Sequence, residues 1–97
     1  DPGRVRTALL GGSAYSRVLE NHGARMLARN FRPGFKAWMH QKDMRMVLDE
    51  AHRSGVPAPL SAAAAQWFNA LVGAGLGEED SIAVLKLFEQ MRGGQGR

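Results

Sequence analysis

The chain has 97 residues, enough for one domain with a single hydrophobic core. With 44% hydrophobic and 23% charged residues, it has the composition of a globular protein and not of a disordered tail or a coiled coil. The absence of cysteine excludes a disulfide scaffold, a thiol nucleophile and a zinc–thiolate site. No apolar run approaches about 18 residues, and the start lacks the apolar region of a signal peptide. We therefore expect a cytoplasmic protein without a membrane span.

The net charge of +4 is unevenly distributed along the chain. Residues 1–32 contain six arginines against Asp1 and Glu20, whereas residues 33–97 contain seven basic and seven acidic side chains. A basic excess is the electrostatic signature of nucleic-acid binding. No recognition-helix pattern accompanies these arginines, so we predict no nucleic-acid partner and keep a basic nucleic-acid-binding domain as the less favoured alternative.

The first half of the chain predicts two helices followed by a turn. Asp1-Pro2 is typical of a helix start, and Gly11-Gly12 end that helix. Ser13 is the expected N-cap of a second helix that runs to about Asn30. One apolar stripe marks its buried face: Tyr15, Val18, Leu19, His22 and Met26. Pro33-Gly34 then predicts a turn.

The second half predicts three more helices. One runs from about Phe35 to Ser54, with Gly55 at its C′ position. The next begins near Leu60 or Ser61, and the last follows acidic residues that suit a helix start. The apolar stripe of the fourth helix is Leu60, Ala63, Ala64, Trp67, Phe68 and Leu71. The acids before the fifth helix are Glu78, Glu79 and Asp80, and its buried side is Val84, Leu85, Leu87, Phe88 and Met91. Residues 93–97 are expected to fray.

No segment alternates with period 2, and β-branched residues are scarce. The fold class is therefore predicted to be all-α, with about five helices and short connections.

The third helix is apolar on two faces. Phe35, Trp38, Met39 and Met46 surround Lys42 on one face, and a second group lies opposite. That second group is Ala37, Met44, Val47, Leu48 and Ala51. We expect one face to pack within the domain and the other to meet a partner, a second domain or a ligand. The Lys42 ammonium then either binds an anionic or carbonyl group or reaches water along its own stem.

Other polar residues give weaker signals. His22, His40 and His52 lack the spacing of a metal site, so no metal is predicted. His22 is expected to be a core or boundary residue. No Ser-His-Asp arrangement can be argued for Ser13 or Ser16.

Four segments, in this order, resemble the C-terminal domain of the β-hydroxyacid dehydrogenase family. The segments are Leu10 to Ser16 (LGGSAYS), Asn30 to Phe35 (NFRPGF), His40 to Met44 (HQKDM) and Gly75 to Ser81 (GLGEEDS). The likeness is nearest to the 2-hydroxy-3-oxopropionate reductase and 3-hydroxyisobutyrate dehydrogenase branches, and it covers roughly residues 1–91. It implies the helical C-terminal fold that 6-phosphogluconate dehydrogenase also has.

The resemblance implies a two-domain oxidoreductase in which residues 1–97 are the single helical C-terminal domain. The N-terminal Rossmann domain that binds NAD or NADP, and the helix with the catalytic lysine, are then absent from this chain. No catalytic residue is expected here, and the isolated chain is expected to be inactive. The implied partners are that Rossmann domain, further copies in a dimer or tetramer, and a small hydroxy-acid substrate or its semialdehyde. The alternative is a non-catalytic helical dimerisation module.

The resemblance also assigns roles to three residues. Lys42 matches the family lysine that contacts the cofactor, and Phe35 matches an aromatic residue that lines the substrate pocket. Asp43 is assigned to the substrate, with a structural or orienting role as the alternative. Under the same assignment, the arginines of residues 1–32 are expected near the missing domain or a partner subunit.

Overall fold

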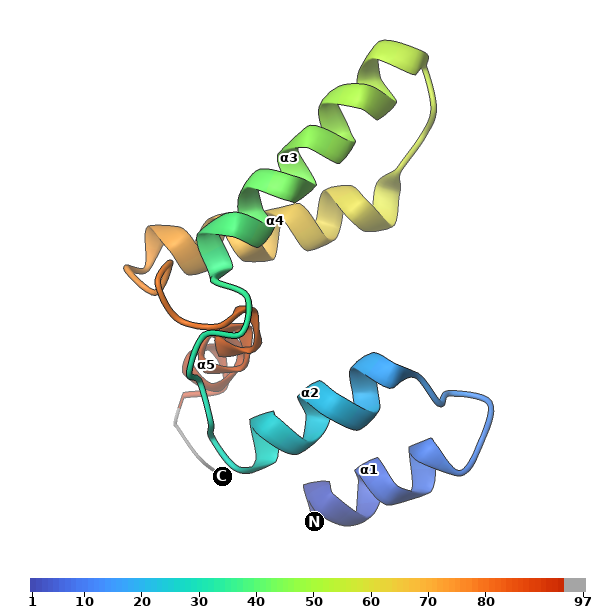
Figure 1. Ribbon diagram of the computed structural model, residues 1–97, viewed down its shortest axis with the longest axis vertical. Helices are drawn as coiled ribbons and strands as arrows, with labels where there is room; N and C mark the ends of the chain where they lie inside the picture. The colour runs from blue at the N-terminus through green and yellow to red at the C-terminus, as the bar shows by residue number, and fades with distance from the viewer. Residues whose placement is uncertain (94–97) are drawn as a thin grey trace. The chain divides into compact units, whose positions relative to one another are not determined.

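The computed structural model describes residues 1–93, which form five α-helices and one short 3-10 helix (Figure 1). They are α1 (Pro2–Leu10), α2 (Arg17–Leu27), α3 (Ala37–Ser54), α4 (Pro59–Gly73), the 3-10 helix η1 (Ser81–Ala83) and α5 (Val84–Met91). The all-α prediction is confirmed. The expected frayed tail lies, from residue 94 onward, outside the described residues. None of the helices within residues 1–93 has the length and apolarity that a membrane span requires.

The described chain divides into two compact units, and the first, Asp1–Phe31, is the N-terminal unit. Asp1 caps α1 as predicted, since its carboxylate accepts a hydrogen bond from the Gly3 amide at 2.8 Å. The cap predicted at Ser13 is wrong. Ser16 is the N-cap of α2, because its extended backbone lets its hydroxyl accept from the Leu19 amide at 2.9 Å. The helix ends at Leu27, earlier than predicted.

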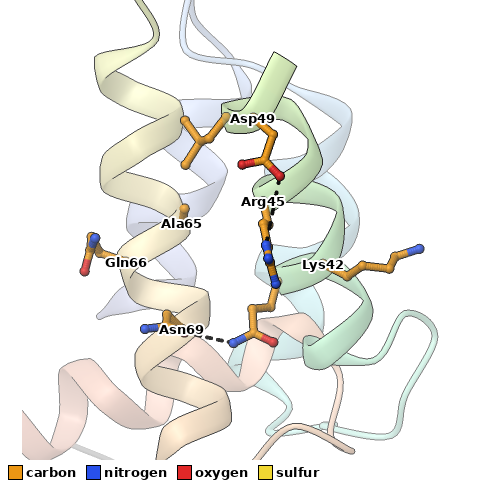
Figure 2. A pocket seen from close by; sticks show the side chains of 8 residues that line it. Lys42, Arg45, Asp49, Ala65, Gln66 and Asn69 are labelled. Atoms are coloured by element: carbon orange, nitrogen blue, oxygen red, sulfur yellow. Dashed lines mark hydrogen bonds and ion pairs between the residues drawn. The ribbon is translucent and has the colours of Figure 1, made fainter. Parts of the chain in front are cut away.

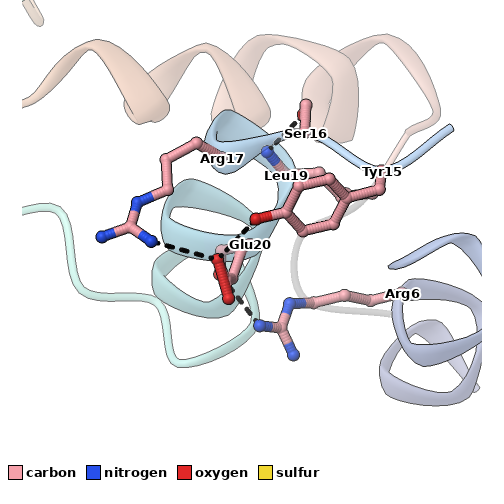
Figure 3. Close-up of polar contacts among 6 residues, drawn as sticks. All are labelled: Arg6, Tyr15, Ser16, Arg17, Leu19 and Glu20. Carbon is pink, nitrogen blue, oxygen red and sulfur yellow. Dashed lines mark hydrogen bonds and ion pairs between the residues drawn. The ribbon is translucent and has the colours of Figure 1, made fainter. Parts of the chain in front are cut away.

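Polar contacts join α2 to α1 and to the connection before it (Figure 3). The Arg6 guanidinium donates to the Glu20 carbonyl at 2.9 Å, and the Tyr15 hydroxyl donates to the Glu20 carboxylate at 3.2 Å. No residue of α1 or α2 is buried. The stripe predicted to face a core is therefore open at Tyr15 and Val18, which are 52% and 66% exposed. Leu19, His22 and Met26 are half-buried, and for His22 this agrees with a boundary position.

The second unit, from Arg32 onward, is the C-terminal unit. Helices α3 and α4 form a hairpin that turns at Gly55, which adopts the left-handed φ of 71° expected at C′ (Figure 1). The Trp67 and Phe88 rings lie 4.8 Å apart and join α4 to α5. The buried apolar residues of the unit are Ala37, Leu71, Ile82, Ala83 and Leu87.

Three helix starts differ from the prediction. Helix α3 begins at Ala37 and not at Phe35, because Lys36 is extended and the first free amides of the helix find acceptors outside it. The Ala37 amide donates to the Glu79 carbonyl at 2.8 Å, and the Trp38 amide donates to the Gly77 carbonyl at 3.0 Å. Helix α4 begins slightly early, at Pro59, where a missing N–H costs nothing. The acids 78–80 precede η1 and do not start α5.

The predicted core stripes are confirmed only in part, and Ala63 inside the stripe of α4 is exposed. Leu71 and Leu87 are buried as expected. Leu60, Phe88 and Met91 were expected to be buried but are 85%, 44% and 68% exposed. Leu60 lies in the first turn of α4, and Met91 is the last residue of α5.

Candidate functional site

Lys42 and Asp43 form an ion pair near the middle of α3. The Lys42 Nζ lies 3.1 Å from Asp43 Oδ1, and the two side chains are 56% and 46% exposed. An ammonium group carries three N–H donors, and this carboxylate occupies only part of that capacity. The pair therefore leaves donors on Lys42 for another acceptor.

The face of α3 that carries Lys42 is open along much of its length. Trp38 and Met46 on this face are 42% and 61% exposed, whereas Ala37 on the opposite face is fully buried. This arrangement agrees with the expectation that one face packs within the domain. Val47 departs from it, since this member of the packing face is 48% exposed.

A groove of about 410 Å³ separates α3 from α4, and Lys42 is at its edge (Figure 2). Its polar side chains pair with each other. Gln41 donates to Asn69 at 2.9 Å, and the Arg45 guanidinium lies 4.0 Å from the Asp49 carboxylate. Figure 2 shows Lys42 extending away from α4. The Lys42 ammonium is thus presented outward, not into the groove.

Phe35 lies in the turn before α3, so its predicted place on a helical face is wrong. Its ring is 40% exposed and packs edge-on against His40, with centroids 5.6 Å apart. The His40 ring in turn stacks on Phe68 of α4, at 4.1 Å. Phe35 therefore belongs to an aromatic cluster held by α3 and α4, whereas Lys42 and Asp43 pair separately.

The residues that hold the Phe35 turn were not predicted from the sequence. The Gly34 and Phe35 amides both donate to the buried carboxylate of Asp80, and the Ser81 hydroxyl lies 3.0 Å from His40 Nδ1. An Asp before a short helix is a recognisable N-cap, and Asp80 does cap η1. Nothing local to residues 80–81 indicates a contact with a turn more than forty residues earlier.

Metal binding has no support from the described residues. Within residues 1–93, no group of three His, Asp or Glu side chains is placed to hold a metal ion.

The sequence and the fold both match known proteins. Residues 1–88 match a family model described as NAD-binding of NADP-dependent 3-hydroxyisobutyrate dehydrogenase. The chain is 43% identical over 91 residues to the 2-hydroxy-3-oxopropionate reductase of Escherichia coli K12, covering 94% of this chain and 31% of that protein. It is 38% identical over 88 residues to the L-threonate dehydrogenase of Cupriavidus necator, covering 91% of this chain and 30% of that protein.

A solved structure shares the fold. The 3-hydroxyisobutyrate dehydrogenase of Salmonella typhimurium superposes with a TM-score of 0.86 at 26% sequence identity, covering 90% of this chain and 30% of that one. The chain thus spans about a third of the length of the relatives that it matches.

The family model names NAD and NADP as the cofactors of the proteins that carry this domain. The sequence match and the fold match agree: this chain belongs to the 3-hydroxyisobutyrate dehydrogenase-like family of NAD(P)-dependent β-hydroxyacid dehydrogenases.

Proposed function

We propose that the chain is the helical C-terminal domain of a two-domain oxidoreductase that acts on a small hydroxy acid or its semialdehyde. The match of residues 1–88 to the family model carries this proposal. The named relatives act on 2-hydroxy-3-oxopropionate and on L-threonate, which are both small oxygenated acids. In this proposal, the Rossmann domain and the catalytic lysine belong to the part of the relatives' length that this chain does not cover.

Each predicted site residue has a role in this proposal. Lys42 binds the cofactor through its ammonium, and Asp43 orients Lys42 and borders the substrate. The exposed part of the Phe35 ring borders the substrate and excludes water from it. The nicotinamide, when bound, supplies the hydride chemistry. The 3.1 Å pair of Lys42 and Asp43 and the 40% exposure of Phe35 support these roles.

A chimera tests the function directly. The matching third of the E. coli reductase is replaced by this chain, and the consumption of NADH or NADPH is followed with 2-hydroxy-3-oxopropionate. We expect the chimera to turn over and the 97-residue chain alone to be inactive. A chimera that folds with native secondary structure and yet has no activity contradicts the proposal.

The role of Lys42 is tested by Lys42→Met, which keeps the apolar stem and removes the charge. Loss of a charged hydrogen bond raises the KM for the cofactor by about tenfold to a hundredfold. Arg45→Met is the matched control on the same helix, since Arg45 is more exposed and lies near Asp49. We expect this control to change the KM by less than about twofold. An unchanged KM in the Lys42 variant contradicts the assignment.

We also propose that the domain dimerises, and its open apolar side chains support this. Val5 and Val18 of the N-terminal unit are 57% and 66% exposed. In sedimentation experiments on the complete protein, Val18→Glu should weaken the dimer, whereas Ala24→Glu, about 120° around the same helix, should not. A purely dimerising module, the alternative function, would lose assembly in the Val18 variant but show no cofactor effect in the Lys42 variant.

A further inference from the structure

The turn that carries Phe35 is fastened to a distant segment of the chain, residues 77–82. Lys36 and Asp80 form an isolated antiparallel bridge, and the Ser81 amide donates to the Phe35 carbonyl at 3.0 Å. The same segment supplies the carbonyls that accept from the first amides of α3. One segment therefore sets both the position of Phe35 and the start of the helix that carries Lys42.

The Asp80 carboxylate is the centre of this attachment. Asp80 is 2% exposed, and its Oδ1 accepts from the Gly34 amide at 2.8 Å and from the Phe35 amide at 3.0 Å. Its Oδ2 accepts from the Ile82 amide at 2.9 Å. Three N–H donors converge on two oxygens, which suits a carboxylate because both of its oxygens accept hydrogen bonds. An asparagine would direct an NH2 group at one of these donors.

Ser81 fixes the Phe35 turn from the other side. Its hydroxyl donates to the Phe35 carbonyl at 3.2 Å and lies 3.0 Å from His40 Nδ1. Because the single hydroxyl proton goes to the carbonyl, His40 Nδ1 is assigned as the donor to Ser81. His40 is the ring against which Phe35 packs. Ser81 thus holds the backbone of Phe35 directly and its ring through His40.

We propose that Asp80 and Ser81 are positioning residues that hold the Phe35 ring in place beside the substrate. The proposal rests on the proposed role of Phe35. A ring that borders a substrate must keep its place when the substrate is absent, and small displacements of a positioning group reduce catalysis. Four hydrogen bonds from two adjacent residues hold a turn whose aromatic side chain is 40% exposed.

The test uses the complete oxidoreductase with 2-hydroxy-3-oxopropionate and compares the KM for substrate with the KM for cofactor. Ser81→Ala should raise the substrate KM by about threefold to tenfold and leave the cofactor KM nearly unchanged. Ser81→Thr, which keeps the hydroxyl, should restore most of the loss. Asp80→Asn should give a larger rise, and Ser81→Ala keeps the test valid if the Asp80 variant does not fold. Glu78→Gln is the matched control, because Glu78 is an exposed acid that pairs with Lys36.

A double-variant cycle separates this proposal from the proposed function. If Ser81 acts through the ring, Ser81→Ala should have no further effect on substrate KM in the F35A background. The positioning role is wrong if the substrate KM rises in F35A but not in Ser81→Ala, or if Ser81→Ala has the same effect in both backgrounds. Neither result contradicts the proposed function. An unchanged substrate KM in F35A overturns the role of Phe35, and the positioning role with it.

Discussion

The two units of the molecule differ in what they bury. Within residues 1–93, every buried residue belongs to the C-terminal unit, and α1 and α2 have none. Both units nevertheless consist of helices that the sequence predicts from the same kind of apolar stripe. An apolar stripe therefore predicts that a helix forms, but not that its own chain covers the stripe. Since burial of apolar surface is the main source of stability, we expect the C-terminal unit to form the cooperative core.

The units also differ in their use of charge. The basic excess of the sequence lies mainly in the N-terminal unit, where Arg6 and Arg25 donate to backbone carbonyls of the same unit. Arg17 lies 3.6 Å from Glu20 on the same helix (Figure 3). Arg6 therefore joins α1 to α2, whereas Arg17 and Arg25 make contacts within α2 and with the residues that follow it. Their placement near a second domain or subunit stays a prediction.

The largest expected difference between the units is the loss of stability when one leucine in each unit is replaced with alanine. Leu71 is fully buried, whereas Leu9 is 43% exposed. Leu71→Ala should lower the free energy of unfolding by about 2–5 kcal/mol, because a cavity is left in a packed core. Leu9→Ala should cost less than about 1 kcal/mol. Urea unfolding followed by circular dichroism measures both values, and equal losses would contradict the difference between the units.

Whether a feature could be predicted from the sequence depends on how far apart in the chain its interacting residues lie. The helices and the Gly55 cap depend on neighbours within one or two turns, and both were predicted. The start of α3 was wrong because it depends on carbonyls of residues 77 and 79. The Lys42–Asp43 pair is local, whereas the attachment of Phe35 to Asp80 spans 45 residues and has no local signature.

Hydrogen exchange compares the local stability of the two units at individual amides. Amides of α4 near Leu71 should exchange only when the core opens, whereas those of α1 should open locally. We expect exchange in α1 to be faster by about a hundredfold or more after correction for intrinsic rates. The complete protein supplies a second measurement, in which α1 should slow down if a partner domain or subunit covers the N-terminal unit. Equal protection of α1 and α4 in the isolated chain would show that the two units open together.

The cap of α2 distinguishes two serines three residues apart. The Ser16 hydroxyl accepts from the Leu19 amide at 2.9 Å, whereas Ser13 lies in the preceding turn. Ser16→Ala should destabilise the N-terminal unit by about 1 kcal/mol, and Ser13→Ala should leave it nearly unchanged. The loss should be visible in α2 amide exchange and absent from the fluorescence of the two tryptophans, which both belong to the C-terminal unit. A larger effect at Ser13 than at Ser16 would show that Ser13 is the N-cap, as the sequence predicted.

The smallest expected effect compares one helical glycine from each unit. Replacing a helical glycine with alanine stabilises by up to about 1 kcal/mol when there is room for the new methyl group. Gly73 has no atom within 4 Å of the position of a Cβ, so Gly73→Ala should gain stability. At Gly23 a Cβ would lie 3.3 Å from Arg6 Cδ and 3.4 Å from Arg6 Nε, so the guanidinium that donates to Glu20 must shift. Gly23→Ala should therefore gain less than Gly73→Ala, and it should recover the difference in the R6A background. If Gly23→Ala stabilises the chain as much as Gly73→Ala with Arg6 in place, the contact between Arg6 and Gly23 does not limit how closely α1 and α2 approach.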